Sequence, residues 1–283
     1  MELREAIGRR RSMRFLLPYK PVEREKIQRM LEAARLASFW GNVQALRAVV
    51  IERATAPKEV IEALPPGSAI AGFQLRLAPV LIVWYVDWSL LKVQGDRLHE
   101  LVEAGAVGVD RDQSHRYLDE SLIPFFQAGM EGIKAGGMTE MDCGQGIAQA
   151  TLVAFEQGLG TCLIGVPAQK KLKRVLALPA DVKILVVQTV GYPAESPDAG
   201  GQRPRLPFEQ QYFLNKGGQP FPRDEKVVEG LKQEKMIQTP APVPWRRAEL
   251  AYLARALEIS PIFGEEVTEM TQHIMKDMMD QES

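Results

Sequence analysis

The chain has 283 residues, of which 46% are hydrophobic and 25% are charged, the balance of an ordinary folded protein. This length suits one large domain with an appendage, or two small domains. The net charge of −1 gives no global attraction to nucleic acid or to an anionic membrane, so we expect any anion-binding site to be a local cluster of cations.

The composition argues against several kinds of binding site and against targeting or membrane-spanning segments. There are two cysteines, Cys143 and Cys162, with no CxxC pair, and the three histidines lie far apart in sequence. A zinc site or a disulfide framework is therefore not expected, and a reducing cytoplasm fits best. The chain is charged from residue 2 without an apolar run, which predicts no signal peptide. The longest apolar run, near residues 80–86, is too short to span a bilayer.

The first half of the chain alternates between helical and extended patterns. Residues 3–10 predict a short helix and residues 18–38 a stronger one. Residues 47–52 predict a short strand. Residues 79–87 form a long apolar run rich in β-branched and aromatic side chains, which indicates a central strand. Residues 88–137 are mostly helical in pattern. The stripe expected to be buried on the second helix is Ile27, Met30, Leu31, Ala34 and Leu36.

The second half contains the strongest helix. Small and apolar residues fall on nearly every face of residues 142–157, so we expect a helix that is buried all round. Asp142 is the expected N-cap, and Gly158 the expected stop. An amphipathic helix is predicted over residues 167–178, and a second core strand over residues 182–192.

After about residue 206 the composition becomes rich in proline, glycine and polar residues. We expect a core domain over residues 1–206 and an extension over residues 207–283. Within the extension, residues 240–245 predict an extended arm, and two helices are expected at residues 246–257 and about 265–280.

A short basic stretch, "RRRSMRF", occupies residues 9–15. Because Arg10, Ser12 and Arg14 alternate, an extended segment would turn them to one side. Guanidinium groups with a serine hydroxyl suit a phosphate monoester. A solvated basic surface is the more common explanation of such a cluster taken alone. A nucleic-acid contact is not expected, because the stretch is short and carries no interleaved aromatic residues.

A second basic pair, Arg203 and Arg205, follows the last predicted core strand. Loops behind strand ends often gather ligand-binding groups. These residues could also be ordinary exposed loop arginines. Together the two clusters supply at least four cations, enough for a phosphate of charge about −1.5 to −2.

Residues 37–45, "ASFWGNVQA", combine flat rings with amides. Phe39 and Trp40 offer faces for stacking, and Asn42 and Gln44 can pair with the polar edge of a heterocycle. A helix stop with buried aromatic rings explains the same residues.

The stretch "GLGTCLIG", residues 158–165, has three glycines that let the backbone approach a flat group, although an ordinary turn between helices would also use them. The nearby "GQGIAQ", residues 144–149, lacks the third glycine of a dinucleotide fingerprint. No histidine is matched to Cys143 or Cys162, so both are expected to be packed small residues rather than nucleophiles.

Taken in order, these segments resemble the nitroreductase-like flavoprotein family. The similarity covers about residues 4–206, and any one motif is weak, whereas the ordered set is fairly specific. The motifs are "RRSMRF" at 10–15, "EAARLA" at 32–37, "SFWGNVQAL" at 38–46, "DCGQGIAQATLVAFEQGLGTCLIG" at 142–165, "VGYPAE" at 190–195 and "RPR" at 203–205.

The resemblance implies an α+β fold around a mixed, mainly antiparallel sheet flanked by helices, with a C-terminal helical extension that wraps the partner subunit. It implies a cytoplasmic homodimer, with FMN bound non-covalently at the interface. Residues 38–42 would reach the partner's flavin, and residues 162–165 would lie along the ring. The implied cofactor contacts are Arg10, Arg11, Ser12, Arg14, Ser38, Phe39, Trp40, Asn42, Gln44, Cys162, Leu163, Ile164, Gly165, Arg203 and Arg205.

The sequence departs from the family pattern beside the expected flavin. Ser38, Phe39 and Trp40 replace the usual Pro-Ser-Ser/Ala, and residues 45–46 replace the usual Pro-Trp. Phe39 and Trp40 would then line the substrate pocket. The nearest candidate for the pyrimidine edge of the flavin is Gln74.

The resemblance further implies a ping-pong oxidoreductase in which NADH or NADPH gives hydride to the flavin N5, and a nitroaromatic, quinone or enone-like acceptor removes it. No catalytic side chain and no metal is needed. Two alternatives stay open. One keeps the fold and FMN with a specialised reaction: reductive dehalogenation, oxidation of a biosynthetic intermediate, or oxygen-dependent flavin breakdown. The other is a non-enzymatic flavin- or partner-binding protein.

Overall fold

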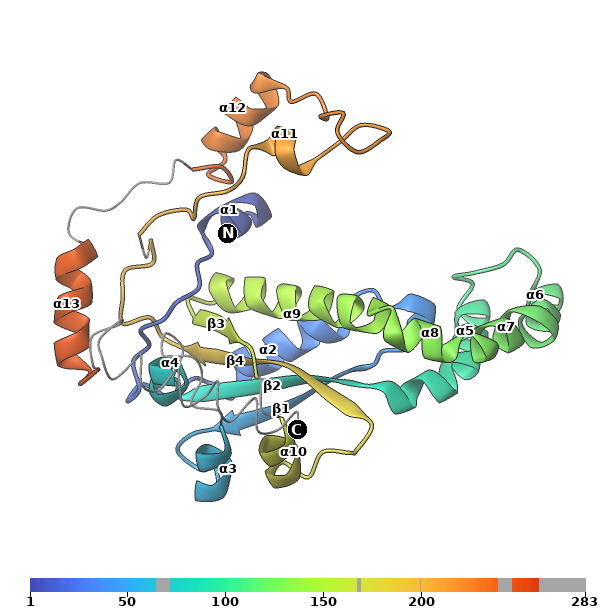
Figure 1. Cartoon of the computed structure of the whole chain (residues 1–283), viewed down its shortest axis with the longest axis horizontal. Helices are drawn as coiled ribbons and strands as arrows, with labels where there is room; N and C mark the ends of the chain where they lie inside the picture. The colour runs from blue at the N-terminus through green and yellow to red at the C-terminus, as the bar shows by residue number, and fades with distance from the viewer. Residues whose placement is uncertain (65–71, 167–168, 199, 239–245, 260–283) are drawn as a thin grey trace.

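A four-stranded sheet forms the centre of the molecule (Figure 1). The computed structural model describes residues 1–64, 72–166, 169–198, 200–238 and 246–259. The strands are β1 Leu46–Glu52, β2 Val80–Asp87, β3 Gly160–Ile164 and β4 Val182–Gly191, in the order β1-β2-β4-β3. All neighbouring strands pair antiparallel, and Ser12 adds a parallel bridge to Thr161 beside β3. The expected α+β fold with a mixed, mainly antiparallel sheet is confirmed.

The strand order follows from hydrophobicity. The apolar run of β2 is almost entirely buried, and β2 lies inside the sheet between β1 and β4. At one edge lies β1, and at the other lies β3. The sequence interpretation of residues 160–164 as a turn is wrong, because these residues pair with β4 from Gly160–Gly191 to Ile164–Val187. A strand of five residues with a glycine at its start carries little propensity of its own, and pairing with β4 stabilises it.

Helices pack around the sheet and make up more than half of the other described residues. In the described residues the helical elements are α1 Leu3–Arg9, α2 Arg24–Arg35, η1 Trp40–Asn42, α3 Lys58–Ala63, α4 Gly72–Leu77, η2 Trp88–Val93, α5 Gln94–Glu103, α6 Arg111–Tyr117, η3 Leu118–Leu122, α7 Ile123–Ala128, α8 Met130–Ala135, α9 Met138–Glu156, α10 Lys170–Val175, α11 Phe208–Gln211, α12 Glu225–Gln233 and α13 Arg246–Ala256.

Two layers of helices bury the two faces of the sheet. On one face α2 and α9 pack together over Ile82 and Trp84, through Met30 and Ala150 among others. On the other face α3 and α10 cover Val83 and its neighbours. In Figure 1 the helices α5 to α8 continue beyond one end of the sheet as a helical lobe, which confirms the helical pattern expected for residues 88–137.

Helix α9 differs from its prediction in two respects. It begins at Met138, so Asp142 lies inside the helix, and the residue at the N-cap position is Gly137. It is also not buried all round in a single chain, because Gly144, Gln145 and Ala148 lie on an exposed face. The expected stop is confirmed: Gly158 has a φ of +76°, and the Leu159 N–H donates to the Ala154 carbonyl oxygen at 2.9 Å.

The extension contains more regular structure than its composition indicates. Helix α13 matches the prediction for residues 246–257. Helices α11 and α12 were not expected, because proline and glycine interrupt the apolar pattern around them. The arm predicted at residues 240–245 and the helix predicted near 265–280 lie outside the described residues.

Candidate functional site

The N-terminal basic stretch runs beside the edge strand β3. The Met13 N–H donates to the Thr161 carbonyl oxygen at 2.9 Å, next to the bridge between Ser12 and Thr161. The approach is close because β3 begins with glycine. A Cβ on Gly160 would lie 2.8 Å from the Met13 Cβ. Gly160 therefore allows this stretch to lie against the sheet.

Burial alternates along this stretch. Arg11, Met13 and Phe15 are buried, with 5%, 2% and 1% of their surface exposed. Between them, Ser12 and Arg14 are only partly buried, as is Arg10. The alternation expected for an extended segment is present, and Arg10, Ser12 and Arg14 share the less buried side.

Arg203 and Arg205 come from a segment that lies beside this stretch. Burial and the charge of Arg205 lower the pKa of Arg10 from its usual value. Burial and the charge of Arg14 lower the pKa of Arg203. The Gln202 amide donates to the Gly8 carbonyl oxygen at 3.3 Å, so the two basic clusters of the sequence lie on neighbouring segments. We call Arg10, Arg14, Arg203 and Arg205 the arginine cluster.

The cluster has spare hydrogen-bond donors. Within the described part of the chain, the guanidinium groups of Arg10 and Arg14 donate to no protein acceptor, and that of Arg205 donates only to the neighbouring Pro204 carbonyl oxygen, at 3.2 Å. Arg10 and Arg14 are partly buried, and such cations with free donors are costly unless an anion completes them, whereas Arg205 is exposed. With Ser12 beside it, this cluster suits a phosphate group.

Arg11 behaves differently from its neighbours. Its Nη1 donates to the Gly8 carbonyl oxygen at 2.6 Å, and its Nη2 donates to Gln238 Oε1 at 2.9 Å. These bonds turn the buried guanidinium toward the C-terminal extension.

A buried acid supports the cluster, in a role that its place at the end of the motif "VGYPAE" did not indicate. Glu195 has 3% of its surface exposed, and its Oε1 accepts hydrogen bonds from the backbone N–H groups of Arg14 and Phe15. Its Oε2 pairs with Arg246 of helix α13. In the sequence Glu195 is one acid in a polar loop, and only the fold shows that it is buried.

The aromatic segment, residues 38–44, lies before β1 and has an unusual backbone. Gly41, Asn42 and Gln44 all have positive φ values near +52°. Asp142 of α9 anchors this backbone, because its Oδ2 accepts from the Trp40 N–H at 2.7 Å. The Gln44 amide donates to Asn42 Oδ1 at 3.2 Å. The segment is therefore held in place within its own chain.

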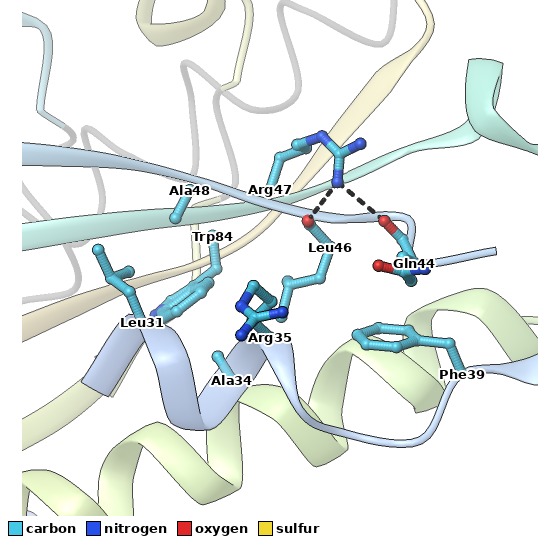
Figure 2. A pocket seen from close by; sticks show the side chains of 9 residues that line it. All are labelled: Leu31, Ala34, Arg35, Phe39, Gln44, Leu46, Arg47, Ala48 and Trp84. Atoms are coloured by element: carbon cyan, nitrogen blue, oxygen red, sulfur yellow. Dashed lines mark hydrogen bonds between the residues drawn. The ribbon is translucent and has the colours of Figure 1, made fainter. Parts of the chain in front are cut away.

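Both rings of the aromatic segment contact their own chain. The Trp40 ring meets Phe126 of the helical lobe edge-on, with 4.9 Å between the ring centroids. Phe39 lines a pocket of about 310 Å³ between α2 and β1 (Figure 2). Figure 2 shows the Arg47 guanidinium, which donates to the carbonyl oxygens of Gln44 and Leu46, at the rim of this pocket.

In one chain the aromatic segment and the arginine cluster do not meet. Thr161, beside Ser12, is in register through β4 and β2 with Glu52 of β1. The segment enters β1 at Leu46, six positions from Glu52. Strand spacings of about 4.8 Å and a rise of about 3.3 Å per residue place Leu46 roughly 14 Å across the sheet and roughly 20 Å along it from Thr161.

Residues 162–165 follow the same edge past Ser12. Leu163 is 45% exposed, whereas Ile164 is buried. A Cβ on Gly165 would meet nothing within 4 Å. On this edge the backbone is open to a flat ligand beside the arginine cluster.

The two cysteines are poor nucleophiles in this setting. Burial raises the pKa of Cys143 to about 12 and also raises the pKa of Cys162. Both thiols are therefore protonated at neutral pH. Gln74, the candidate for the flavin edge, lies buried on α4.

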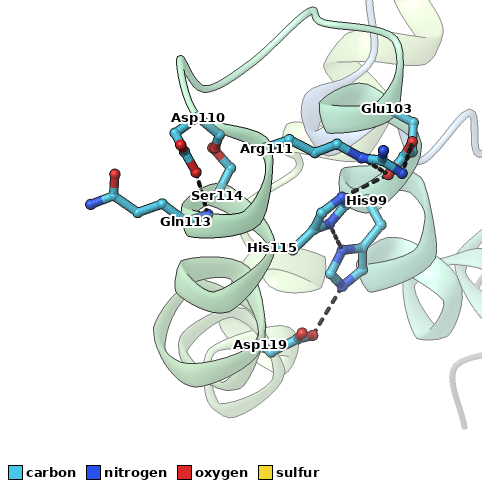
Figure 3. A network of polar contacts seen from close by, with 8 residues as sticks. All are labelled: His99, Glu103, Asp110, Arg111, Gln113, Ser114, His115 and Asp119. Carbon is cyan, nitrogen blue, oxygen red and sulfur yellow. Dashed lines mark hydrogen bonds and ion pairs between the residues drawn. The ribbon is translucent and has the colours of Figure 1, made fainter.

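A separate polar network joins α5 to α6 and η3 in the helical lobe (Figure 3). The Nδ1 atoms of His99 and His115 lie 2.6 Å apart. Their Nε2 atoms face Asp119 at 3.0 Å and Glu103 at 2.7 Å. The sequence analysis treated these histidines as unconnected, because the turn between α5 and α6 that brings them together has no distinctive pattern. The described residues include no cluster of three or more ligands suited to a metal ion.

No described helix is long and apolar enough to cross a membrane. The Nitroreductase family model matches residues 7–108 and 126–192. Comparison with curated proteins finds no significant match.

Solved structures of the same fold support this match. An FMN complex of a nitroreductase candidate from Exiguobacterium sibiricum is 21% identical, with a TM-score of 0.60, and the match covers 73% of this chain and 94% of that one. A nitroreductase family protein from Streptococcus pneumoniae is 20% identical, with a TM-score of 0.61, over 76% and 100% of the two chains. A candidate NAD(P)H:FMN oxidoreductase from Staphylococcus epidermidis is 18% identical, with a TM-score of 0.62, over 75% and 95%. The chain belongs to the nitroreductase family.

Proposed function

We propose that the protein is an FMN-dependent oxidoreductase whose arginine cluster holds the FMN phosphate. The proposal is carried by the meeting of the segment of Arg10 and Arg14 with the segment of Arg203 and Arg205, joined by the Gln202 amide on the Gly8 carbonyl oxygen, and by the guanidinium donors of Arg10, Arg14 and Arg205 that no described protein side chain accepts. Ser12 adds a hydroxyl on the same side. A phosphate dianion would accept these donors and relieve the repulsion between the cations.

The flavin ring would lie along residues 162–165, where the exposed edge of the strand leaves room for it. Bound FMN supplies hydride chemistry, from NADH or NADPH to an electron-poor acceptor such as a nitroaromatic, a quinone or an enone-like compound. The side chains hold and orient the cofactor. Because Cys143 and Cys162 are protonated thiols, no nucleophile of the chain is assigned to the reaction.

We further propose that two chains share each site. The aromatic segment lies too far from the arginine cluster of its own chain, so Phe39, Trp40 and Asn42 would reach a flavin held by a partner. The exposed face of α9 supports this arrangement. Its Gly144 and Ala148 are small residues that the sequence indicates should be buried, and a second copy would cover them.

Phe39 and Trp40 would then form one wall of the acceptor pocket. Because Trp40 packs against Phe126, this wall would continue into the helical lobe. A specialised reaction on the same cofactor is the second candidate, since two large rings narrow the space left for an acceptor. The assignment to a reducing cytoplasm stays a prediction from the cysteine content.

The absorption spectrum of the purified protein tests the cofactor, and rapid mixing with NADH or NADPH without oxygen tests the reaction. The proposal expects a yellow protein whose visible flavin band bleaches, and then recovers when a nitroaromatic or a quinone is added. Bound FMN that neither nucleotide reduces would contradict the proposed donor and favour the second candidate. A protein that binds no FMN would contradict the function as a whole.

A further inference from the structure

We propose that Arg246 of the C-terminal extension is a positioning residue for the phosphate site, and that it acts through the buried carboxylate of Glu195. This inference rests on the proposed FMN site. It gives the extension a role inside its own chain, in addition to the expected contact with a partner. Residues 195 and 246 both lie beyond the part of the chain that the family model matches.

Glu195 fixes the backbone that presents Arg14. Its Oε1 accepts from the Arg14 N–H and from the Phe15 N–H, the latter at 3.0 Å. Phe15 is 1% exposed and anchors the segment in a core that includes Leu253 of α13. The direction of the Arg14 side chain therefore depends on the position of the Glu195 carboxylate.

Arg246 holds that carboxylate from the other side. Its Nη2 pairs with Glu195 Oε2, and its Nη1 pairs with Glu249 Oε2 at 2.6 Å. The Glu249 Oε1 in turn accepts from the Ser196 N–H at 2.6 Å. This closed network joins the first turn of α13 to residues 14–15 and residues 195–196.

The charge of Arg246 matters as much as its hydrogen bonds. The Glu195 side chain is only 1% exposed, so water cannot screen its negative charge. An uncompensated carboxylate behind Arg14 would oppose a phosphate in front of it. Arg246 lies between the Glu195 and Glu249 carboxylates and offsets the charge of Glu195, so the arginine cluster keeps more of its positive charge for the ligand.

A second contact holds the extension to the same site. Gln238 accepts from Arg11 through Oε1 at 2.9 Å, and its N–H donates to Gln202 Oε1 at 2.8 Å. The Gln202 amide donates back to the Gly8 carbonyl oxygen at 3.3 Å. Gln238 thus joins the N-terminal stretch to the segment that carries Arg203 and Arg205. Two separate points of the extension set the spacing of the two halves of the cluster.

The test compares Arg246→Met with Arg247→Met, a change at the exposed neighbour on the same helix. FMN and riboflavin are titrated into each apoprotein, since the two ligands differ only in the phosphate. We expect Arg246→Met to lower the affinity for FMN at least about tenfold, while the affinity for riboflavin changes by less than about twofold. Arg247→Met should bind both ligands like the wild type, and Arg246→Lys should recover part of the FMN affinity.

The double variant Glu195→Gln with Arg246→Met separates positioning from simple loss of structure. The amide oxygen that Glu195→Gln introduces can still accept from both N–H groups, and the charge at position 195 is gone, so FMN affinity should exceed that of Arg246→Met alone. The inference would be overturned if Arg246→Met and the double variant each lowered the affinities for FMN and riboflavin by the same factor. A wild type that prefers FMN, together with an Arg246→Met variant indistinguishable from Arg247→Met, would also overturn it. A wild type that binds both ligands equally would instead contradict the phosphate site itself.

Discussion

The two edges of the sheet hold the two candidate parts of the site in opposite states. Beside β3, the arginine cluster carries guanidinium donors that no described protein group accepts. Beside β1, the aromatic segment has its backbone held by Asp142 and its Trp40 ring packed on Phe126. Excess charge marks the edge where a ligand could supply the acceptors that the described protein groups do not. The aromatic segment already has its hydrogen-bond and packing partners. It therefore offers a preformed wall that a ligand can contact without reordering it.

The largest expected effect is the loss of FMN from the arginine cluster. The double variant Arg14→Ala with Arg205→Ala removes two charge-assisted contacts of roughly 1.5–3 kcal/mol each, so FMN affinity should fall at least about 100-fold. Titration of the apoprotein with FMN measures it. The control is Arg9→Ala, because the Arg9 side chain pairs with Glu5 on α1 instead of joining the cluster. A double variant that purifies fully yellow would show that the phosphate lies elsewhere.

Mixed dimers test whether the two edges build one site from two chains. One chain carries Arg14→Ala with Arg205→Ala, the other carries Phe39→Ala with Asn42→Ala, and different tags isolate the mixed pair. Each variant alone should lose FMN. The mixed dimer should hold about half the FMN of the wild type, because one of its two sites combines an intact cluster with an intact segment. A mixed dimer without FMN would place both parts of the site in a single chain.

Asp142→Asn tests the anchor of the aromatic segment. The Trp40 N–H would exchange a charged acceptor for a neutral amide oxygen, a change worth roughly 1 kcal/mol, and we expect lower stability and weaker FMN binding. Urea unfolding measures the stability. The matched control is Glu156→Gln, an exposed acid at the end of the same helix. Equal stability of the two variants would show that the anchor contributes nothing.

Asp142 also shows what the sequence could and could not reveal. The helical pattern, Gly158 as its stop and the apolar β2 were all predictable, because periodicity and turn residues act locally. The start of α9 was not predictable, because four more residues before Asp142 extend the helix through contacts with other elements. The roles of Glu195 and Arg246 depend on residues 51 positions apart, and no local pattern encodes such a pair. The arginine cluster could be proposed only because two motifs were considered together.

A smaller effect is expected from glycine substitutions at the start of β3 and just after its end. Gly160→Ala would push its new methyl group against Met13 at 2.8 Å, and overpacking of this kind costs roughly 1–3 kcal/mol. The shift would move the stretch that carries Arg14, so FMN binding should weaken together with the thermal midpoint. Gly165→Ala has open space and should leave the midpoint unchanged. A Gly160→Ala variant as stable as the wild type would show that the stretch can move away freely.

The smallest effect concerns Cys143. Burial raises the pKa of its thiol to about 12 in the folded chain, above the 9.0 that is usual for a cysteine. The stabilisation from keeping this thiol neutral is therefore complete below pH 9 and is lost as the pH rises toward 12. Iodoacetamide at pH 8 should leave Cys143 unlabelled in the folded protein and label it after denaturation, as read by mass spectrometry. Rapid labelling of the folded chain would contradict the burial.

The comparison of FMN with riboflavin on the wild-type apoprotein tests the central claim most directly. If the arginine cluster holds the phosphate, calorimetry should give an FMN affinity at least about 100-fold higher than that for riboflavin, and added salt should narrow the difference. Equal affinities for the two flavins at low salt would contradict the claim.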